Sequence, residues 1–314
     1  MTRSSLALFA LLALAAATPA LAGAAACWFE NGVVVVPAEV MGVSGDYILD
    51  TATPHTLLAE TQAQTAGFAE TALNGEVRLA GVAVEGQAVA VADLDMRTGA
   101  LPTPIAGVIG ADVLKAFVLD VSFAPCRVAL IPAGHAPRFA AQAALPMSWI
   151  AERPVVTAAA SDGAHIQAGA FTPGTGADVG VRISDAVASA PGAAKPKELY
   201  PYGVSRPRLR ALSFAGGLQE NLPAGLLKAE DPALIGQIGA PLLAHWRLRF
   251  DFPGGRLLLG APQAAPVSSP RSSRSRRRPA ARPPRRAAAR SAADCGSAPK
   301  ACRIAARSAT GWRW

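Results

Sequence analysis

Apolar and polar positions alternate over short stretches along most of the chain. Apolar segments, most of them rich in Val, are bounded by Gly, Asn and Pro at residues 33–42, 46–50, 76–86, 87–95 and 117–131. Alternation with a period of two, interrupted by turn residues, is typical of β-strands. Helical periodicity is scarce and predicts only two short helices, Thr56–Ala66 and Asp112–Ala116. The body of the chain is therefore predicted to be mainly β.

One block of this pattern occurs twice. Residues 107–130 read GVIGADVLKAFVLDVSFAPCRVAL, and residues 236–259 read GQIGAPLLAHWRLRFDFPGGRLLL. The blocks align without a gap at a separation of 129 residues, and both begin with Gly-x-Ile-Gly. Upstream, residues 77–94 loosely parallel residues 209–226. An internal repeat of this kind predicts two similar β lobes, with a boundary between residues 132 and 154.

The first 22 residues have a different pattern. An Arg near the start, a short apolar stretch and Ala20-Leu21-Ala22 follow the order of a secretory signal peptide. We therefore expect residues 1–22 to be removed and the protein to be exported, periplasmic or secreted. The alternative is a retained anchor, for which the apolar stretch is short.

Charge is distributed unevenly along the chain. The formal net charge is +8, but residues 265–314 alone hold twelve Arg, one Lys and one Asp, a net of +12. This Arg/Pro/Ala-rich tail has few large apolar residues, so it is predicted to be disordered. Its charge suits an anionic surface, whereas no motif for specific nucleic-acid binding accompanies it. A disordered extension without a specific partner is the simpler alternative.

Export would permit disulfides. Cys27 and Cys126 lie near the two ends of the first repeat, and we expect them to pair. Cys295 and Cys302 both lie in the tail, and whether they pair stays open. The alternative for all four is a free thiol.

A strand that ends in a carboxylate carries the candidate chemistry. Ile48-Leu49-Asp50 is followed by Thr51-Ala52-Thr53, and later come Val108-Ile109-Gly110 and its second copy, Gln237-Ile238-Gly239. This pattern resembles the aspartic proteases, and the bacterial retropepsin-like group in particular, over about residues 33–260. The resemblance implies two acid-protease-like β-barrel lobes around a central cleft, with Asp50 catalytic. It also implies that Thr51, Ala52 and Thr53 support the catalytic loop and that Gly110 and Gly239 form the glycine step of each lobe.

The second lobe departs from the family's pattern. Gly174-Thr175-Gly176-Ala177 stands where the resemblance implies a second Asp-Thr-Gly-Ala loop, so Gly174 replaces the second aspartate. In the family, two neighbouring carboxylates share a proton, one activating water and the other protonating the peptide carbonyl. No metal or cofactor is implied, and the four His residues have no metal-ligand spacing. A single Asp50 would leave this chemistry weak, unless two chains paired their first lobes.

Three functions follow as hypotheses. The first is an exported aspartic-type endopeptidase whose activity is weak or lost. The second is a pseudoprotease that binds extended peptides without cutting them, and the third is an envelope interaction protein that uses its basic tail. The oligomeric state stays open. The predicted organisation is a signal peptide (1–22), a first lobe (23–132), a linker (133–154), a second lobe (155–262) and a tail (263–314).

Overall fold

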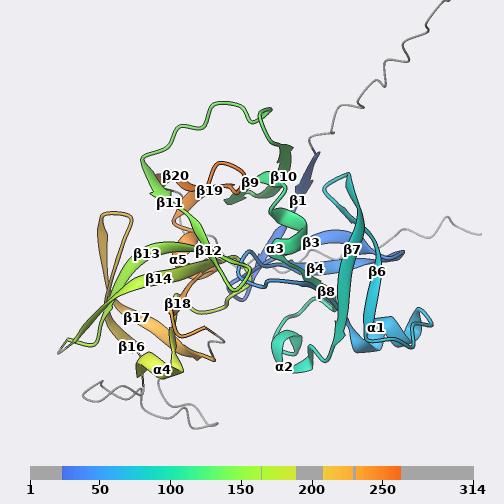
Figure 1. Ribbon diagram of the computed structural model, residues 1–314, viewed down its shortest axis with the longest axis horizontal. Coiled ribbons are helices and arrows are strands. Elements are labelled where there is room, and N and C mark those ends of the chain that lie inside the picture. The colour runs from blue at the N-terminus through green and yellow to red at the C-terminus, as the bar shows by residue number, and fades with distance from the viewer. Residues whose placement is uncertain (1–22, 164, 189–207, 229–230, 263–314) are drawn as a thin grey trace, which may run out of the picture. The chain divides into compact units, whose positions relative to one another are not determined.

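The computed structural model describes residues 23–163, 165–188, 208–228 and 231–262 (Figure 1). Within these ranges the chain forms twenty strands and five short helices, so the mainly β prediction is confirmed. The predicted signal peptide, the predicted tail and the pair Cys295 and Cys302 lie outside the described residues. Within the described ranges, none of the helices combines the length and apolar character needed to span a membrane.

The first lobe is a closed β-barrel. Its strands are β3 (Val33–Val40), β4 (Val43–Leu49), β5 (Thr56–Ala59), β6 (Ala72–Leu79), β7 (Val82–Ala92) and β8 (Ile105–Ile109). They are hydrogen-bonded in the order β3-β4-β8-β5-β7-β6, and β3 pairs with β6 to close the barrel. Strand β2 (Trp28–Glu30) adds to the free side of β3. Inward-facing Val, Leu and Ile side chains of these strands fill the interior, as the alternating pattern predicts.

The second lobe repeats this arrangement strand for strand. Its strands are β13 (Arg153–Ser161), β14 (Ile166–Gly174), β15 (Val181–Ser184), β16 (Arg208–Phe214), β17 (Gly217–Leu227) and β18 (Leu234–Gly239). The order is β13-β14-β18-β15-β17-β16, closed by pairing of β13 with β16, with β12 (Ser148–Ile150) on the edge. The two similar lobes predicted from the internal repeat are therefore confirmed.

A third sheet joins the two lobes. Its order is β1 (Gly23–Ala26), β10 (Cys126–Pro132), β9 (Phe117–Phe123), β19 (Trp246–Asp251), β20 (Arg256–Pro262) and β11 (Ala143–Pro146). At its centre Asp120 of β9 lies opposite Arg249 of β19. These two positions are equivalent in the repeat, so the pair lies on the approximate two-fold axis that relates the lobes. The guanidinium binds both carboxylate oxygens, at 2.6 and 2.7 Å, and lies 4.8 Å above the Phe139 ring.

The helices are α1 (Glu60–Thr65), α2 (Asp95–Thr98), α3 (Ala111–Leu114), α4 (Asp185–Ala188) and α5 (Ala240–Leu243). The prediction of a helix over Thr56–Ala66 is wrong in its first part, because Thr56–Ala59 forms β5. That segment pairs with β7 in parallel and with β8 in antiparallel, and these long-range pairings override the local pattern. The helix predicted at 112–116 is α3. Residues 133–154, assigned to a linker, contain β11 and β12.

Cys27 and Cys126 form a disulfide with their Cα atoms 4.9 Å apart. It joins the segment between β1 and β2 to the start of β10. The Cys27 amide also donates to the Cys126 carbonyl at 3.2 Å. These contacts fasten the first segment of the described chain to the sheet that joins the lobes.

Candidate active site

Asp50 follows directly after β4, where the strand leaves the barrel interior. Its amide donates to the carbonyl of Ile109 at 3.0 Å, so the neighbouring strand β8 supports the loop. The side chain is only 3% exposed. The loop turns back at once, because the Thr53 amide donates to the Asp50 carbonyl at 3.3 Å. An apolar strand therefore delivers a buried carboxylate to the tip of a tight loop.

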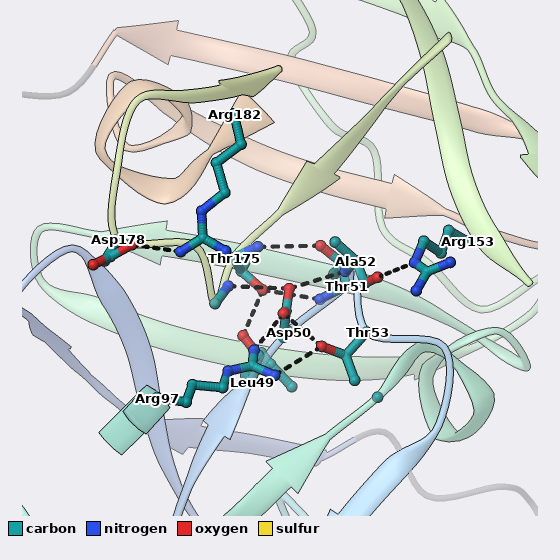
Figure 2. A network of polar contacts seen from close by, with 12 residues as sticks. Leu49, Asp50, Thr51, Ala52, Thr53, Arg97, Arg153, Thr175, Asp178 and Arg182 are labelled. Atoms are coloured by element: carbon teal, nitrogen blue, oxygen red, sulfur yellow. Dashed lines mark hydrogen bonds and ion pairs between the residues drawn. The ribbon is translucent and has the colours of Figure 1, made fainter. Parts of the chain in front are cut away.

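Two buried threonines join this loop to its counterpart in the second lobe (Figure 2). The Thr51 hydroxyl donates to the Pro173 carbonyl at 2.5 Å, and the Thr175 hydroxyl donates to the Leu49 carbonyl at 2.6 Å. Each hydroxyl also accepts the backbone amide of the other threonine at 3.3 Å. The reciprocal contacts make Thr51 and Thr175 equivalent, and they place Gly174 at the position equivalent to Asp50.

The glycine steps lie directly behind these loops. A β-carbon at Gly110 would come within 2.6 Å of the His55 backbone, and one at Gly239 would overlap the Val179 carbonyl. The residue after each glycine then ties the loop down: Ala111 donates to the Thr53 carbonyl at 2.7 Å, and Ala240 donates to the Ala177 carbonyl at 3.0 Å. The same device thus fixes both loops, and only glycine fits the close backbone approach.

Four donors surround the Asp50 carboxylate (Figure 2). The amides of Ala52 and Gly176 donate to Oδ1 at 2.9 and 3.2 Å. The Thr53 hydroxyl and the Arg97 guanidinium donate to Oδ2 at 2.7 and 2.5 Å. Burial alone would raise the pKa of Asp50, but the Arg97 charge and the other donors outweigh burial and lower it below its usual value. Asp50 is therefore held as an ionised carboxylate.

Arg97 is a site residue that sequence reasoning missed. It lies on α2, in the segment between β7 and β8, and its side chain is 30% exposed. It also donates to the Thr53 hydroxyl at 3.1 Å. A lone Arg 47 residues from Asp50 carries no pattern in the sequence, and only the course of the chain after β7 brings it over the carboxylate.

Gly174 faces the Asp50 carboxylate directly. A β-carbon built at position 174 would lie 3.3 Å from Asp50 Oδ1 and 2.9 Å from the Ala52 β-carbon. It would also collide with the side-chain amide of Gln237, which occupies the space that a residue 174 side chain would need. Gly176 is constrained in another way, because its β-carbon would come within 2.5 Å of the Asp50 β-carbon.

Gln237 is a second residue that the sequence analysis did not single out, although a signal was present. It stands at the Val108 position of the repeat, where a polar side chain interrupts an apolar strand. Its side chain is 5% exposed. An amide therefore lies where the repeat and the loop geometry would otherwise leave room for a second carboxylate.

The predicted loop residues come together, and Asp50, Ala52, Thr53 and Gly176 among them line one side of a cleft with a volume of about 370 Å³. The disulfide cysteines lie at the sheet that joins the lobes, Cys27 just after β1 and Cys126 at the start of β10, and they do not line the cleft. Within the described residues no group of His, Cys, Asp and Glu side chains could hold a metal ion. The cleft is lined by Val33, Asp50, Ala52, Thr53, Pro54, Met96, Arg97, Arg153, Thr172, Gly176, Asp178, Arg182, Leu227, Lys228, Leu234 and Gln237.

An Asp50→Asn variant should unfold more readily than the parent at neutral pH. The asparagine side chain lacks the negative charge that the four donors stabilise, and Arg97 loses its counter-ion. We therefore expect the free energy of unfolding to fall by about 1–3 kcal/mol. A carboxyl whose pKa is lowered in the folded state stabilises that state above its unfolded pKa of about 4. This contribution is lost as the pH falls through the folded pKa, so the difference from the parent should shrink in acid.

Urea unfolding at pH 7 and pH 3 measures both parts of this prediction. Glu70→Gln removes the same charge from an exposed side chain and should leave the unfolding free energy within about 0.5 kcal/mol of the parent. An Asp50→Asn variant as stable as Glu70→Gln at pH 7 would contradict the prediction.

Comparison with known proteins identifies the fold of the chain but no family by sequence. No family model matches the chain, and no curated protein matches it. Among solved structures, the aspartic proteinase from Irpex lacteus is similar with a TM-score of 0.50 and 13% identity, covering 80% of this chain and 100% of that chain. Basic 7S globulin from soybean is similar with a TM-score of 0.47 and 11% identity, covering 77% and 95%. The two closed barrels thus match the bilobal pepsin-like fold.

Proposed function

We propose that this chain is an exported pseudoprotease, which binds extended peptides in its cleft without cutting them. The observation that carries the proposal is Gly174, which faces Asp50 where the chemistry needs a second carboxylate. With glycine at that position, none of the described residues places a carboxyl there to share a proton with Asp50 or to protonate a peptide carbonyl.

The environment of Asp50 supports the same conclusion. A carboxylate that activates water as a base needs an oxygen free to accept a proton. Both Asp50 oxygens already accept two hydrogen bonds each, and the Arg97 charge favours the ionised form. Asp50 is better suited to fastening the loop than to moving protons.

The lining of the cleft supports peptide binding. Its volume of about 370 Å³ lies within the range of ligand sites in proteins. Met96 is 99% exposed at its rim, and the partly exposed Leu227 adds apolar surface beside the polar groups. Apolar and polar groups interleaved in one concave surface suit an extended peptide, whose side chains alternate in direction. Export is supported by the leader pattern of residues 1–22 and by the Cys27–Cys126 disulfide.

Digestion and binding assays test this proposal together. Incubation of the purified protein with an unfolded protein substrate, from pH 2.5 to pH 8, should give no more cleavage than an Asp50→Ala variant. Labelled peptide pools should bind to the parent in a fluorescence anisotropy assay. Cleavage that disappears in Asp50→Ala would instead support the peptidase hypothesis. Absence of both cleavage and binding would favour the hypothesis that the basic tail does the work, which truncation after Gly260 then tests.

A further inference from the structure

The two lobes differ sharply along one row of side chains beside the cleft. In the second lobe Gln237 of β18 is paired in register with Thr172 of β14 on one side and with Arg182 of β15 on the other. We call these three residues the polar row. All three line the cleft.

The equivalent row in the first lobe is apolar. There Val108 of β8 pairs with Ile48 of β4 and with Leu57 of β5. Ile48 and Val108 are fully buried in a small apolar cluster, and Leu57 packs against it. The barrel therefore does not need polar side chains at these positions, because the first lobe forms the same strands without them.

Two members of the polar row have unused hydrogen-bonding capacity. The Thr172 hydroxyl is buried and has no hydrogen-bond partner among the described residues, and the whole residue is only 1% exposed. The Gln237 side-chain amide, 5% exposed, forms no hydrogen bond with any protein group in the described ranges. Buried polar groups are normally satisfied, so an unpartnered hydroxyl and amide on two residues that line the cleft indicate that a ligand supplies the partners.

The charge around the polar row defines the ligand. The cleft lining holds four cationic side chains, Arg97, Arg153, Arg182 and Lys228, against two carboxylates, Asp50 and Asp178. Arg97 neutralises Asp50, and Arg182 pairs with Asp178 at 2.7 Å. Counted over all lining residues the formal net charge is +2, and Lys228, exposed at the edge, contributes one of the positive charges. Amide and hydroxyl donors beside excess positive charge form a site for a carboxylate.

We propose that the polar row and Lys228 bind the carboxylate of an acidic side chain in an extended peptide. The proposal rests on the peptide-binding function above and adds the class of peptide. The Gln237 amide and the Thr172 hydroxyl donate to the carboxylate oxygens, and Lys228 supplies the charge. Arg182, whose charge Asp178 balances, offers its remaining N–H groups. An Asp or Glu side chain reaches the row from a peptide that lies along the cleft past Met96.

Three pools of fluorescein-labelled heptapeptides test this selectivity against the full chain. The central residue is Glu, Gln or Lys, and every flanking position holds an equal mixture of Ala, Val, Leu and Ser. We expect the Glu pool to bind about tenfold more tightly than the Gln pool in fluorescence anisotropy, because charge-assisted bonds replace neutral ones. The Lys pool should bind most weakly, and added salt should reduce the preference for Glu.

Two variants trace the preference to the polar row. Gln237→Val with Arg182→Leu copies the residues of the first lobe and should reduce the Glu preference to about twofold or less while the Gln pool still binds. Lys228→Gln, at an exposed position that does not disturb folding, should reduce it by about threefold. Arg127→Leu removes an exposed charge from the sheet that joins the lobes and should leave the preference unchanged.

The outcomes separate this inference from the proposed function. Equal binding of the three pools, or tightest binding of the Lys pool, would overturn the carboxylate site and leave peptide binding intact. A Glu preference that survives in both cleft variants would also overturn it. Failure of every pool to bind at 1 mM protein (roughly the Kd limit of weak complexes) would overturn both proposals.

Discussion

A Thr51→Val/Thr175→Val double variant should lose roughly 4–8 kcal/mol of unfolding free energy. The two hydroxyls satisfy four buried backbone groups, which are the carbonyls of Pro173 and Leu49 and the amides of the two threonines themselves. Valine has nearly the shape of threonine, so no cavity accompanies the change. Each buried group left without a partner is unfavourable by about 1–3 kcal/mol. Such a loss is comparable to the whole stability of many domains.

Urea unfolding measures this loss, and Thr157→Val provides a matched control. Thr157 lies exposed on β13, so its replacement should change the unfolding free energy by no more than about 0.5 kcal/mol. The single variants should each lose about half of the double variant's loss, because each removes two of the four contacts. A double variant within 1 kcal/mol of Thr157→Val (well below the penalty per unpaired group) would show that the contacts do not hold the loops together.

A Gly174→Asp/Gln237→Val variant should gain peptidase activity at acid pH. The aspartate places a second carboxylate beside Asp50, and valine, the residue of the first lobe, removes the amide that occupies its space. The second negative charge opposes the effect of Arg97 on Asp50, because two carboxylates at this distance share a proton, and the shared proton supplies the missing acid. General acid–base catalysis contributes about 10²–10⁴-fold to a rate, so cleavage of an unfolded protein should rise by at least about 10²-fold.

Arg97 will shape the pH dependence of this gain. Because its charge favours the ionised form of Asp50, it should also move the acid limb of the rebuilt pair to lower pH. Gly174→Asn/Gln237→Val is the matched control, since asparagine has the same size but is not an acid. Gly174→Asp alone should gain less, because the Gln237 amide obstructs the new side chain. A folded Asp variant that cleaves no faster than the Asn variant would disprove the expectation.

The two loops around Asp50 and Gly174 could be predicted from the sequence, but the side chains that surround them could not. Asp50-Thr51 and the glycine steps are local signals, because a strand end and a close backbone approach each demand particular residue types within a few positions. Arg97 reaches Asp50 only through the path of a loop, which no local pattern encodes. Gln237 could have been found by comparing the two copies of the repeat position by position. Thr56–Ala59 was misassigned because β5 owes its conformation to β7 and β8, not to its own residues.

The contact between Asp120 and Arg249 restricts how lobes of this kind can combine. Since the two residues hold equivalent positions on the approximate two-fold axis, two first lobes joined in the same way would bring one Asp120 carboxylate against another. Two second lobes would likewise oppose two guanidinium groups. Arg249 is only 5% exposed, so two opposed guanidinium groups would have little water to screen their repulsion. The shared sheet therefore favours unlike lobes at neutral pH, and it disfavours an arrangement that pairs two copies of Asp50 through this sheet.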